Sequence, residues 1–223
     1  MPSDTAAAVT ITYLGHSSLL VEVADPGGTA TRILLDPGDL TPALDALGPV
    51  DAVLVTHGHP DHLDPAQIRR LQSDGAVPVF GPADLKEQLQ DVDIVTTAVE
   101  PGAFDLGGTR IVVTRTTHET LYPDIPLPEN FAYEIGGRVF ATGDSLTLPT
   151  SPVDVLLAPL AGPWMKLSEG IDFVRAVSPK TVIPVHDAGL APAHRNLHRA
   201  LFTSFAPTGT VIEPLDSGES VTL

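Results

Sequence analysis

Three histidines and an aspartate lie within six residues, directly after an apolar run. The segment His57-Gly58-His59-Pro60-Asp61-His62 follows the run 52–55. The run predicts a buried strand, and Pro60 stops strand pairing from continuing past it. Three imidazoles so close together repel one another when they are protonated, so the arrangement is costly without a cation. Neutral imidazoles bind metal cations, and a metal site therefore explains the cluster. The chain must therefore fold so that a strand ends at this segment, which we call the 57–62 segment.

Short runs rich in Val, Ile and Leu recur along the chain, and Gly, Pro or Asp bounds each run. Such runs predict strands, which we place at Val9–Leu14, Leu19–Val23, Arg32–Asp36, Ala52–Thr56, Val77–Phe80, Ile94–Thr97, Arg110–Thr116, Phe131–Ile135, Arg138–Thr142, Val153–Ala158, Thr181–Val185, Thr210–Glu213 and Ser220–Leu223. Gly136-Gly137, between two of these runs, fits the positive φ angles of a tight hairpin turn.

Four segments favour helices. Proline or a capping residue opens each of them, and we place them from Pro65 to about Ser73, at Pro82–Gln90, from Ser168 to just before Pro179, and at Pro192–Phe205. Closely spaced strands early in the chain, followed by alternating strands and helices, indicate a layered α/β sandwich rather than a purely parallel sheet. We expect residues 1–223 to form a single domain.

Further histidines and aspartates follow other predicted strands. His118, Asp144 and His186 each come directly after an apolar run. If these strands end at the same edge as the 57–62 segment, five histidines and two aspartates surround one pocket. Such a set can bind two metal ions with one carboxylate left to bridge them, and imidazole with carboxylate suits Zn, Mn and Fe.

The composition excludes several kinds of site. The chain has no Cys, so a disulfide framework, cysteine-based zinc or iron–sulfur sites and a thiol nucleophile are excluded. Twelve basic residues against 28 acidic ones give a net charge of −16, which argues against long nucleic acids as partners. No export signal or membrane-spanning run is present, and we expect a cytoplasmic protein without membrane partners.

With these residues identified, the sequence resembles the metallo-β-lactamase superfamily over nearly its whole length. The 57–62 segment matches the His-x-His-x-Asp-His signature of that family, and the order of His118, Asp144 and His186 matches as well. Asp36 corresponds to the acidic residue that ends an early strand in the family. The stretch Tyr13-Leu14-Gly15-His16-Ser17-Ser18 is similar to the small hydrolases related to ascorbate phosphate lactonase. The resemblance implies a four-layer αββα sandwich with the metal centre at one edge.

The resemblance also implies a division of the ligands between two divalent cations, Zn first and Mn or Fe as alternatives. The first cation would be held by His57, His59 and His118, and the second by Asp61, His62 and His186, with Asp144 as the bridge. Asp36 is expected outside this set, where it fixes the metal loop by hydrogen bonds.

Four residues are candidates for the substrate side of the site. We expect Asp61 to orient the nucleophile as well as bind metal, and His16 to line the pocket or donate a proton. Trp164 and Lys166 follow a buried run and are expected to form a wall and an anion contact. The alternative for these last two residues is a hydrophobic loop plug.

These features together predict a metal-dependent hydrolase. A hydroxide between two cations would attack a small ester, lactone or phosphate-bearing metabolite, and Lys166 favours a substrate with a carboxylate or phosphate. Two alternatives stay open: a phosphodiesterase or nuclease of the same superfamily, and a non-catalytic metal-binding protein. The expected partner is a small molecule, and a homo-oligomer stays open.

Overall fold

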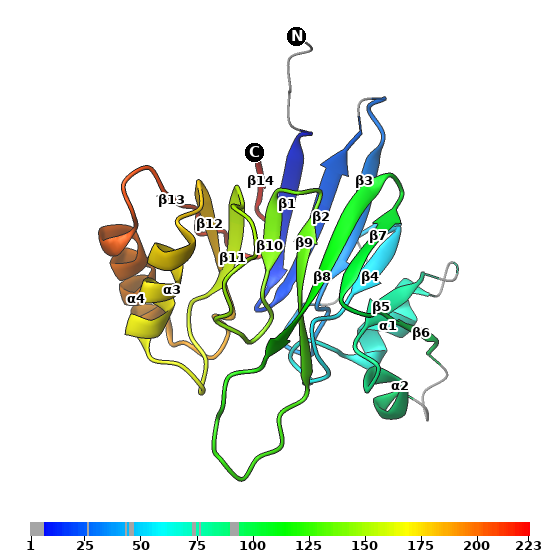
Figure 1. Cartoon of the computed structure of the whole chain (residues 1–223), viewed down its shortest axis with the longest axis horizontal. Coiled ribbons are helices and arrows are strands. Elements are labelled where there is room, and N and C mark those ends of the chain that lie inside the picture. The colour runs from blue at the N-terminus through cyan, green and yellow to red at the C-terminus, as the bar shows by residue number, and fades with distance from the viewer. Residues whose placement is uncertain are drawn as a thin grey trace.

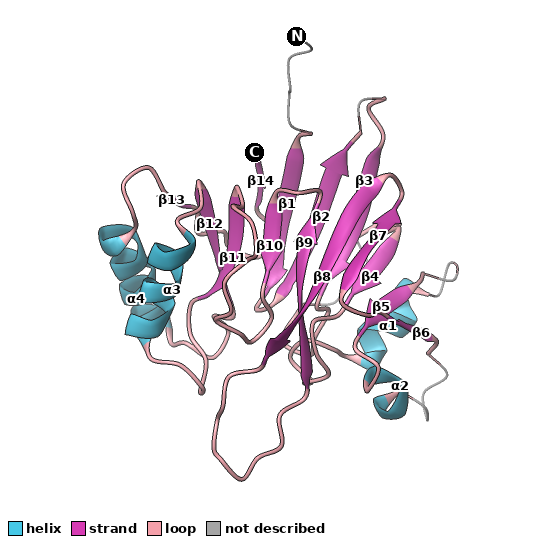
Figure 2. Ribbon diagram, in the orientation of Figure 1, coloured by secondary structure: helices cyan, strands magenta, loops and turns pink. Residues whose placement is uncertain are grey.

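The computed structural model describes residues 7–223, except residues 26, 43, 45, 46, 73, 74, 76 and 90–93. Its described strands form two sheets of seven strands each. The sheets lie face to face, with helices only on their outer sides (Figures 1 and 2). No helix among the described residues is long and apolar enough to cross a lipid bilayer.

The first sheet is mixed. Its strand order is β14-β1-β2-β3-β4-β5-β6, with bounds Ser220–Thr222, Val9–Gly15, Ser18–Ala24, Ala30–Leu35, Ala52–Leu54, Val79–Gly81 and Thr96–Ala98. Strand β2 is antiparallel to both β1 and β3, whereas β3 to β6 are parallel. Strands β1, β3 and β4 therefore run in the same direction.

The second sheet has a similar construction. Its order is β13-β12-β11-β10-β9-β8-β7, with bounds Val211–Ile212, Thr181–Val185, Val155–Pro159, Val139–Ala141, Glu129–Ile135, Thr109–Thr117 and Gly102–Leu106. Strands β10 to β13 are parallel, and β9 is antiparallel to both β10 and β8. Strands β8, β10 and β12 therefore share one direction.

Every predicted strand overlaps an observed one, but the structure also contains β7, which the sequence did not predict. This strand lies at the edge of the second sheet, and only Phe104 and Leu106 in it are half-buried. Alternation over Phe104, Asp105 and Leu106 alone is too short to identify a strand from the sequence.

The core between the sheets explains the alternation in β1. Val9, Ile11 and Tyr13 point into the core, whereas Thr10 and Thr12 between them are half-buried. On the opposite sheet, strands β8, β9, β11 and β12 supply the matching apolar faces. Burial of these faces is the main stabilising term of the sandwich.

The helices complete four layers. Helices α1 (Pro65–Leu71) and α2 (Leu85–Gln88) cover the outside of the first sheet, where Ile68 and Leu85 are fully buried. Helices α3 (Leu167–Val177) and α4 (Pro192–Phe205) cover the second sheet with Phe173 and Phe202. This arrangement confirms the predicted αββα sandwich (Figure 1).

The predicted helix bounds were less accurate than the architecture. Helix α2 begins at Leu85 rather than Pro82. The predicted helix ends at Ser73 and Gln90 lie outside the described residues. The hairpin is confirmed, since Gly136 and Gly137 have φ angles of 60° and 66° and Arg138 N–H donates to the carbonyl of Ile135 at 3.1 Å.

One glycine holds the loop after β3 against the 57–62 segment. A Cβ atom on Gly38 would lie 1.9 Å from the carbonyl oxygen of Asp61 and 2.6 Å from the nitrogen of His62. Real Cβ atoms do not approach backbone atoms so closely, so only glycine permits this packing. The close approach joins two segments far apart in sequence.

We expect Gly38→Ala to displace the 57–62 segment and lower the Tm by at least about 3 °C, because overpacking a tight backbone contact is destabilising. Thermal unfolding followed by circular dichroism measures the change. The control is Gly189→Ala, since a Cβ at Gly189 meets nothing within 4 Å. A Gly38→Ala protein that melts at the wild-type temperature would show that the contact is not tight.

Candidate metal centre

The candidate site lies at one edge of the sandwich, where six strands end. In order along the chain, β1, β3, β4, β8, β10 and β12 are followed by His16, Asp36, the 57–62 segment, His118, Asp144 and His186. Carboxyl ends of parallel strands form such clusters because they open on the same edge of a sheet. The long loop between β8 and β9 leaves this edge at the bottom of Figure 1.

Backbone strain is concentrated at the same edge. Among the described residues, four non-glycine residues have positive φ, and three of them belong here: His16 at 51°, Asp36 at 42° and His186 at 59°. His186 N–H donates to the carbonyl of His16 at 2.8 Å, which ties the two strained residues together. Such conformations persist only where the surroundings hold them, and they are frequent at functional sites.

Two groups of potential ligand atoms lie side by side. In the first group, atoms of His57, His59, His118 and Asp144 lie within 4.8 Å of one another. In the second, atoms of His16, Asp61, His62 and His186 do the same. The structure thus brings all seven predicted ligands to one edge and adds His16 to them.

Asp144 lies between the two groups. Its Oδ1 is 3.1 Å from His62 Nε2, and its Oδ2 is 3.3 Å from His186 Nε2 and 3.5 Å from His118 Nε2. Both carboxylate oxygens are therefore directed at imidazoles. This position fits a bridging carboxylate, although each metal assignment stays a prediction.

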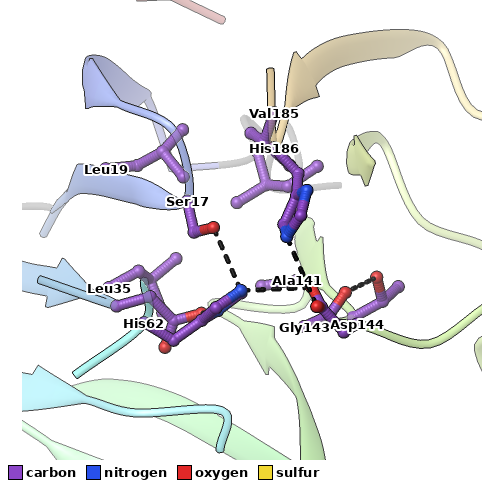
Figure 3. Close-up of a pocket in the computed structure, with 12 residues that line it drawn as sticks. Ser17, Leu19, Leu35, His62, Ala141, Gly143, Asp144, Val185 and His186 are labelled. Atoms are coloured by element: carbon purple, nitrogen blue, oxygen red, sulfur yellow. Dashed lines mark hydrogen bonds and ion pairs between the residues drawn. The ribbon is translucent and has the colours of Figure 1, made fainter. Parts of the chain in front are cut away.

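Behind the two groups, a cavity of about 20 Å³ lies between the sheets. Figure 3 shows His62, Asp144 and His186 at this cavity with Ser17, whose hydroxyl is 3.1 Å from His62 Nε2. Its volume is sufficient for about one water molecule. The apolar side chains around it close the metal centre toward the core.

Hydrogen bonds fix which ring nitrogen of several histidines faces the centre. A carbonyl or carboxylate can only accept, so Nδ1–H is the donor in three pairs: His62 to Asp36 at 2.8 Å, His118 to the carbonyl of Glu119 at 2.6 Å, and His186 to the carbonyl of Ala161 at 2.6 Å. Nε2 is then the atom that can bind a cation.

Asp36 fixes the 57–62 segment as expected. Its buried carboxylate accepts hydrogen bonds from the backbone N–H and the hydroxyl of Thr56, both at 2.7 Å, as well as from His62. It is in neither ligand group. The expectation that Asp36 holds the metal loop by hydrogen bonds is therefore confirmed.

His16 has the opposite ring arrangement. The backbone N–H of Ala188 donates to His16 Nδ1 at 3.2 Å, so the neutral ring carries its proton on Nε2. That Nε2–H donates to Asp61 Oδ2 at 3.1 Å. Burial lowers the pKa of His16, which favours this neutral form. His16 is therefore a hydrogen-bond donor to Asp61 rather than a cation ligand, a pairing that the sequence did not predict.

The donor atoms fit a divalent cation. His118 Nε2, His186 Nε2 and Asp144 Oδ1 are buried, and although each has a carboxylate or imidazole atom within 3.5 Å, none makes a well-aligned hydrogen bond. Leaving such a group unpaired costs about 1–3 kcal/mol, so native structures rarely keep three in one place. A cation that accepts nitrogen and oxygen ligands would satisfy all three atoms.

Protons and cations compete for these nitrogens. Burial lowers the pKa of His62, but the carboxylates of Asp144 and Asp36 raise it well above its ordinary value. Burial acts likewise on His186, whose pKa Asp144 and Asp61 raise to about 9. Metal binding must displace such protons, so metal affinity falls as the pH falls.

A larger cavity opens on the solvent side of the second group. It has a volume of about 420 Å³, and His16, Asp61 and His186 form its polar part. The other lining residues are Leu40, Ala161, Gly162, Pro163, Gly189 and Leu190. This cavity gives a small molecule access to the site.

Two residues predicted on the substrate side lie in different surroundings. Trp164 is buried, and its Nε1–H donates to Asp144 Oδ2 at 2.8 Å. The side chain of Lys166 is 83% exposed at the start of α3, 3.8 Å from Glu169, and it does not line the cavity. The structure thus brings Trp164 to the metal centre and leaves Lys166 at the surface.

Comparisons with known proteins agree with this geometry. A family model described as Beta-lactamase superfamily domain matches residues 10–186. Protein Rv0786c of Mycobacterium tuberculosis is 33% identical over 214 residues, which cover 93% of this chain and 97% of that protein. A UPF0173 metal-dependent hydrolase of Carboxydothermus hydrogenoformans is 29% identical over 198 residues, covering 79% and 83%.

A solved structure shares the fold. Igni18, described as a novel metallo hydrolase from the archaeon Ignicoccus hospitalis, superposes with a TM-score of 0.71 at 22% identity. The match covers 97% of this chain and 98% of Igni18.

We expect Asp36→Asn to weaken zinc binding by about 10-fold or more, because the neutral amide holds Thr56 and His62 less firmly. Asparagine tolerates the positive φ of this residue, so the backbone should persist. Competition with a fluorescent zinc chelator measures the affinity. Asp39→Ala, at an exposed residue of the same loop, is the control. Equal affinities in Asp36→Asn and wild type would contradict the holding role of Asp36.

Proposed function

This chain belongs to the beta-lactamase superfamily, and on that basis we propose that it is a metal-dependent hydrolase. The observation that supports the proposal most is the convergence of imidazoles and carboxylates, several of them without a well-aligned hydrogen bond, beside a cavity open to small molecules. A purely structural role does not explain why so many buried imidazoles and carboxylates gather here with poorly satisfied hydrogen bonds.

The proposed site holds two divalent cations, Zn first and Mn or Fe as alternatives. The assignment gives His57, His59 and His118 to one cation, Asp61, His62 and His186 to the other, and Asp144 to both. The position of Asp144 between the groups supports the bridge.

When bound, two divalent cations lower the pKa of a shared water to give a hydroxide nucleophile and stabilise negative charge on the reacting oxygen. The residues of the chain position this chemistry. Asp61 is part of the cavity wall and can accept a hydrogen bond from the nucleophile. His16 Nε2–H holds one oxygen of Asp61, and Trp164 Nε1–H holds one oxygen of Asp144.

The proposed substrate is a small ester, lactone or phosphate-bearing metabolite. Support comes from the cavity, whose volume of about 420 Å³ suits a small molecule. A net charge of −16 repels long polyanions, so long nucleic acids are not proposed as substrates.

Reconstitution with excess Zn or Mn should give two metals per chain by elemental analysis, because the ligand set is sufficient for both. The loaded protein should hydrolyse a chromogenic ester or phosphodiester, and chelation should abolish that turnover. A ratio that stays at or below one metal per chain would contradict the dinuclear proposal. Full loading without turnover of either substrate would favour the non-catalytic alternative.

Asp144→Ala should lose at least one metal and at least about 100-fold of the activity, since the carboxylate between the two cations is removed. The fold should persist because the apolar strands supply the core, and circular dichroism checks this. Asp172→Ala, at an exposed residue of α3, should keep both metals and full activity. An Asp144→Ala enzyme with full activity and both metals would disprove the role of Asp144.

A further inference from the structure

We propose that the 420 Å³ cavity takes an uncharged, mainly aliphatic arm of the substrate, so that neutral esters or lactones are preferred. This inference rests on the proposed hydrolase function and narrows its substrate class. The reacting group would lie at the metal centre, and the arm would extend along the cavity walls.

Apart from His16, Asp61 and His186, the residues that line the cavity are apolar or glycine. Leu40, Pro163 and Leu190 provide aliphatic surface, and the other wall residues are alanine and glycine. An aliphatic arm would remove this surface from water, which is favourable. Ligand cavities of this size commonly combine apolar walls with a few polar groups that fix orientation.

No lysine or arginine side chain lines the cavity. All twelve Lys and Arg residues lie in the described part of the chain, so the lining set accounts for each of them. Arg195 and Arg199, which follow the Gly189–Leu190 wall in sequence, lie 3.6 and 3.3 Å from the buried carboxylate of Asp187. Both guanidinium groups thus pair with Asp187, and Arg199 pairs with Asp216 as well.

The carboxylate of Asp61 is the acidic group in the lining. An anionic arm that extends along the aliphatic walls would lose hydration, meet no lysine or arginine there, and approach a protein of net charge −16. The expectation of an anionic substrate depends on Lys166, whose side chain lies at the surface beside Glu169. The geometry therefore favours a neutral arm.

Gly189 offers a position at which this charge preference can be changed. It lines the cavity, a Cβ there meets nothing within 4 Å, and its φ is not positive. Gly189→Lys adds a cation to the wall. Gly189→Met adds a neutral side chain of similar length and is the matched control.

The test uses zinc-loaded protein and two chromogenic esters of equal chain length. p-Nitrophenyl hexanoate has a neutral arm, and mono-p-nitrophenyl adipate ends in a carboxylate. We expect kcat/KM to be at least ~10-fold higher for the hexanoate. Gly189→Lys should reduce this ratio at least ~5-fold through the KM of the adipate, whereas Gly189→Met should not.

Two results would overturn the inference while the hydrolase proposal stands. One is equal or faster turnover of the adipate by the wild type. The other is a ratio that Gly189→Lys leaves unchanged. Lys166→Ala tests whether Lys166 contacts an anionic arm. A higher KM for the adipate in this variant would show that it does, and would overturn the inference that the site disfavours anions.

A binding measurement separates the inference from catalysis. Trp164 is the single tryptophan, and its ring centroid is 5.6 Å from that of His186, so its fluorescence reports on the cavity. A methyl ketone with a hexyl arm cannot be hydrolysed and serves as the neutral ligand. Its analogue with a terminal carboxylate should need at least ~10-fold higher concentration to give half of the maximal fluorescence change. If neither ester is hydrolysed but the two ketones differ in affinity in this way, the hydrolase proposal is contradicted and the inference about the cavity stands. Equal binding, or no binding of either ketone, overturns it.

Discussion

Asp144 lies within 3.9 Å of ring nitrogens from four histidines, at an edge where two sheets meet. Concentrating that many titratable groups in a buried volume is costly unless charge and hydrogen-bonding capacity are balanced. The hydrogen bond from Trp164 to Asp144 and the carboxylate of Asp36 beside His62 balance part of this charge. Divalent cations would satisfy the ligand atoms that lack a well-aligned hydrogen bond.

The sandwich provides the rigidity that this edge needs. Parallel strands of both sheets end at the site, so side chains far apart in sequence converge without long loops of their own. Positive φ angles at His16, Asp36 and His186 then aim these residues, and packing from both sheets keeps them in place. Apolar side chains close the site toward the core, whereas the 420 Å³ cavity opens it toward solvent. The core side and the solvent side of the site therefore differ chemically.

Much of this arrangement could be predicted from the sequence, because it is encoded locally. The spacing of histidines and aspartate in the 57–62 segment indicates a metal site, and the apolar runs locate the strands. Contacts between distant segments could not be predicted in this way. The fit of Gly38 against Asp61, the hydrogen bond from His16 to Asp61 and that from Trp164 to Asp144 depend on tertiary packing. Lys166 shows the converse, since proximity in sequence to a site residue does not bring its side chain to the cavity.

We propose that this edge holds two cations, one on each side of the Asp144 carboxylate. Anomalous X-ray diffraction from crystals of the zinc-loaded protein tests it most directly. We expect two zinc peaks, one among His57, His59 and His118 and one among Asp61, His62 and His186, with the carboxylate of Asp144 contacting both. A single peak in fully loaded crystals, or peaks that lie away from Asp144, would contradict the claim.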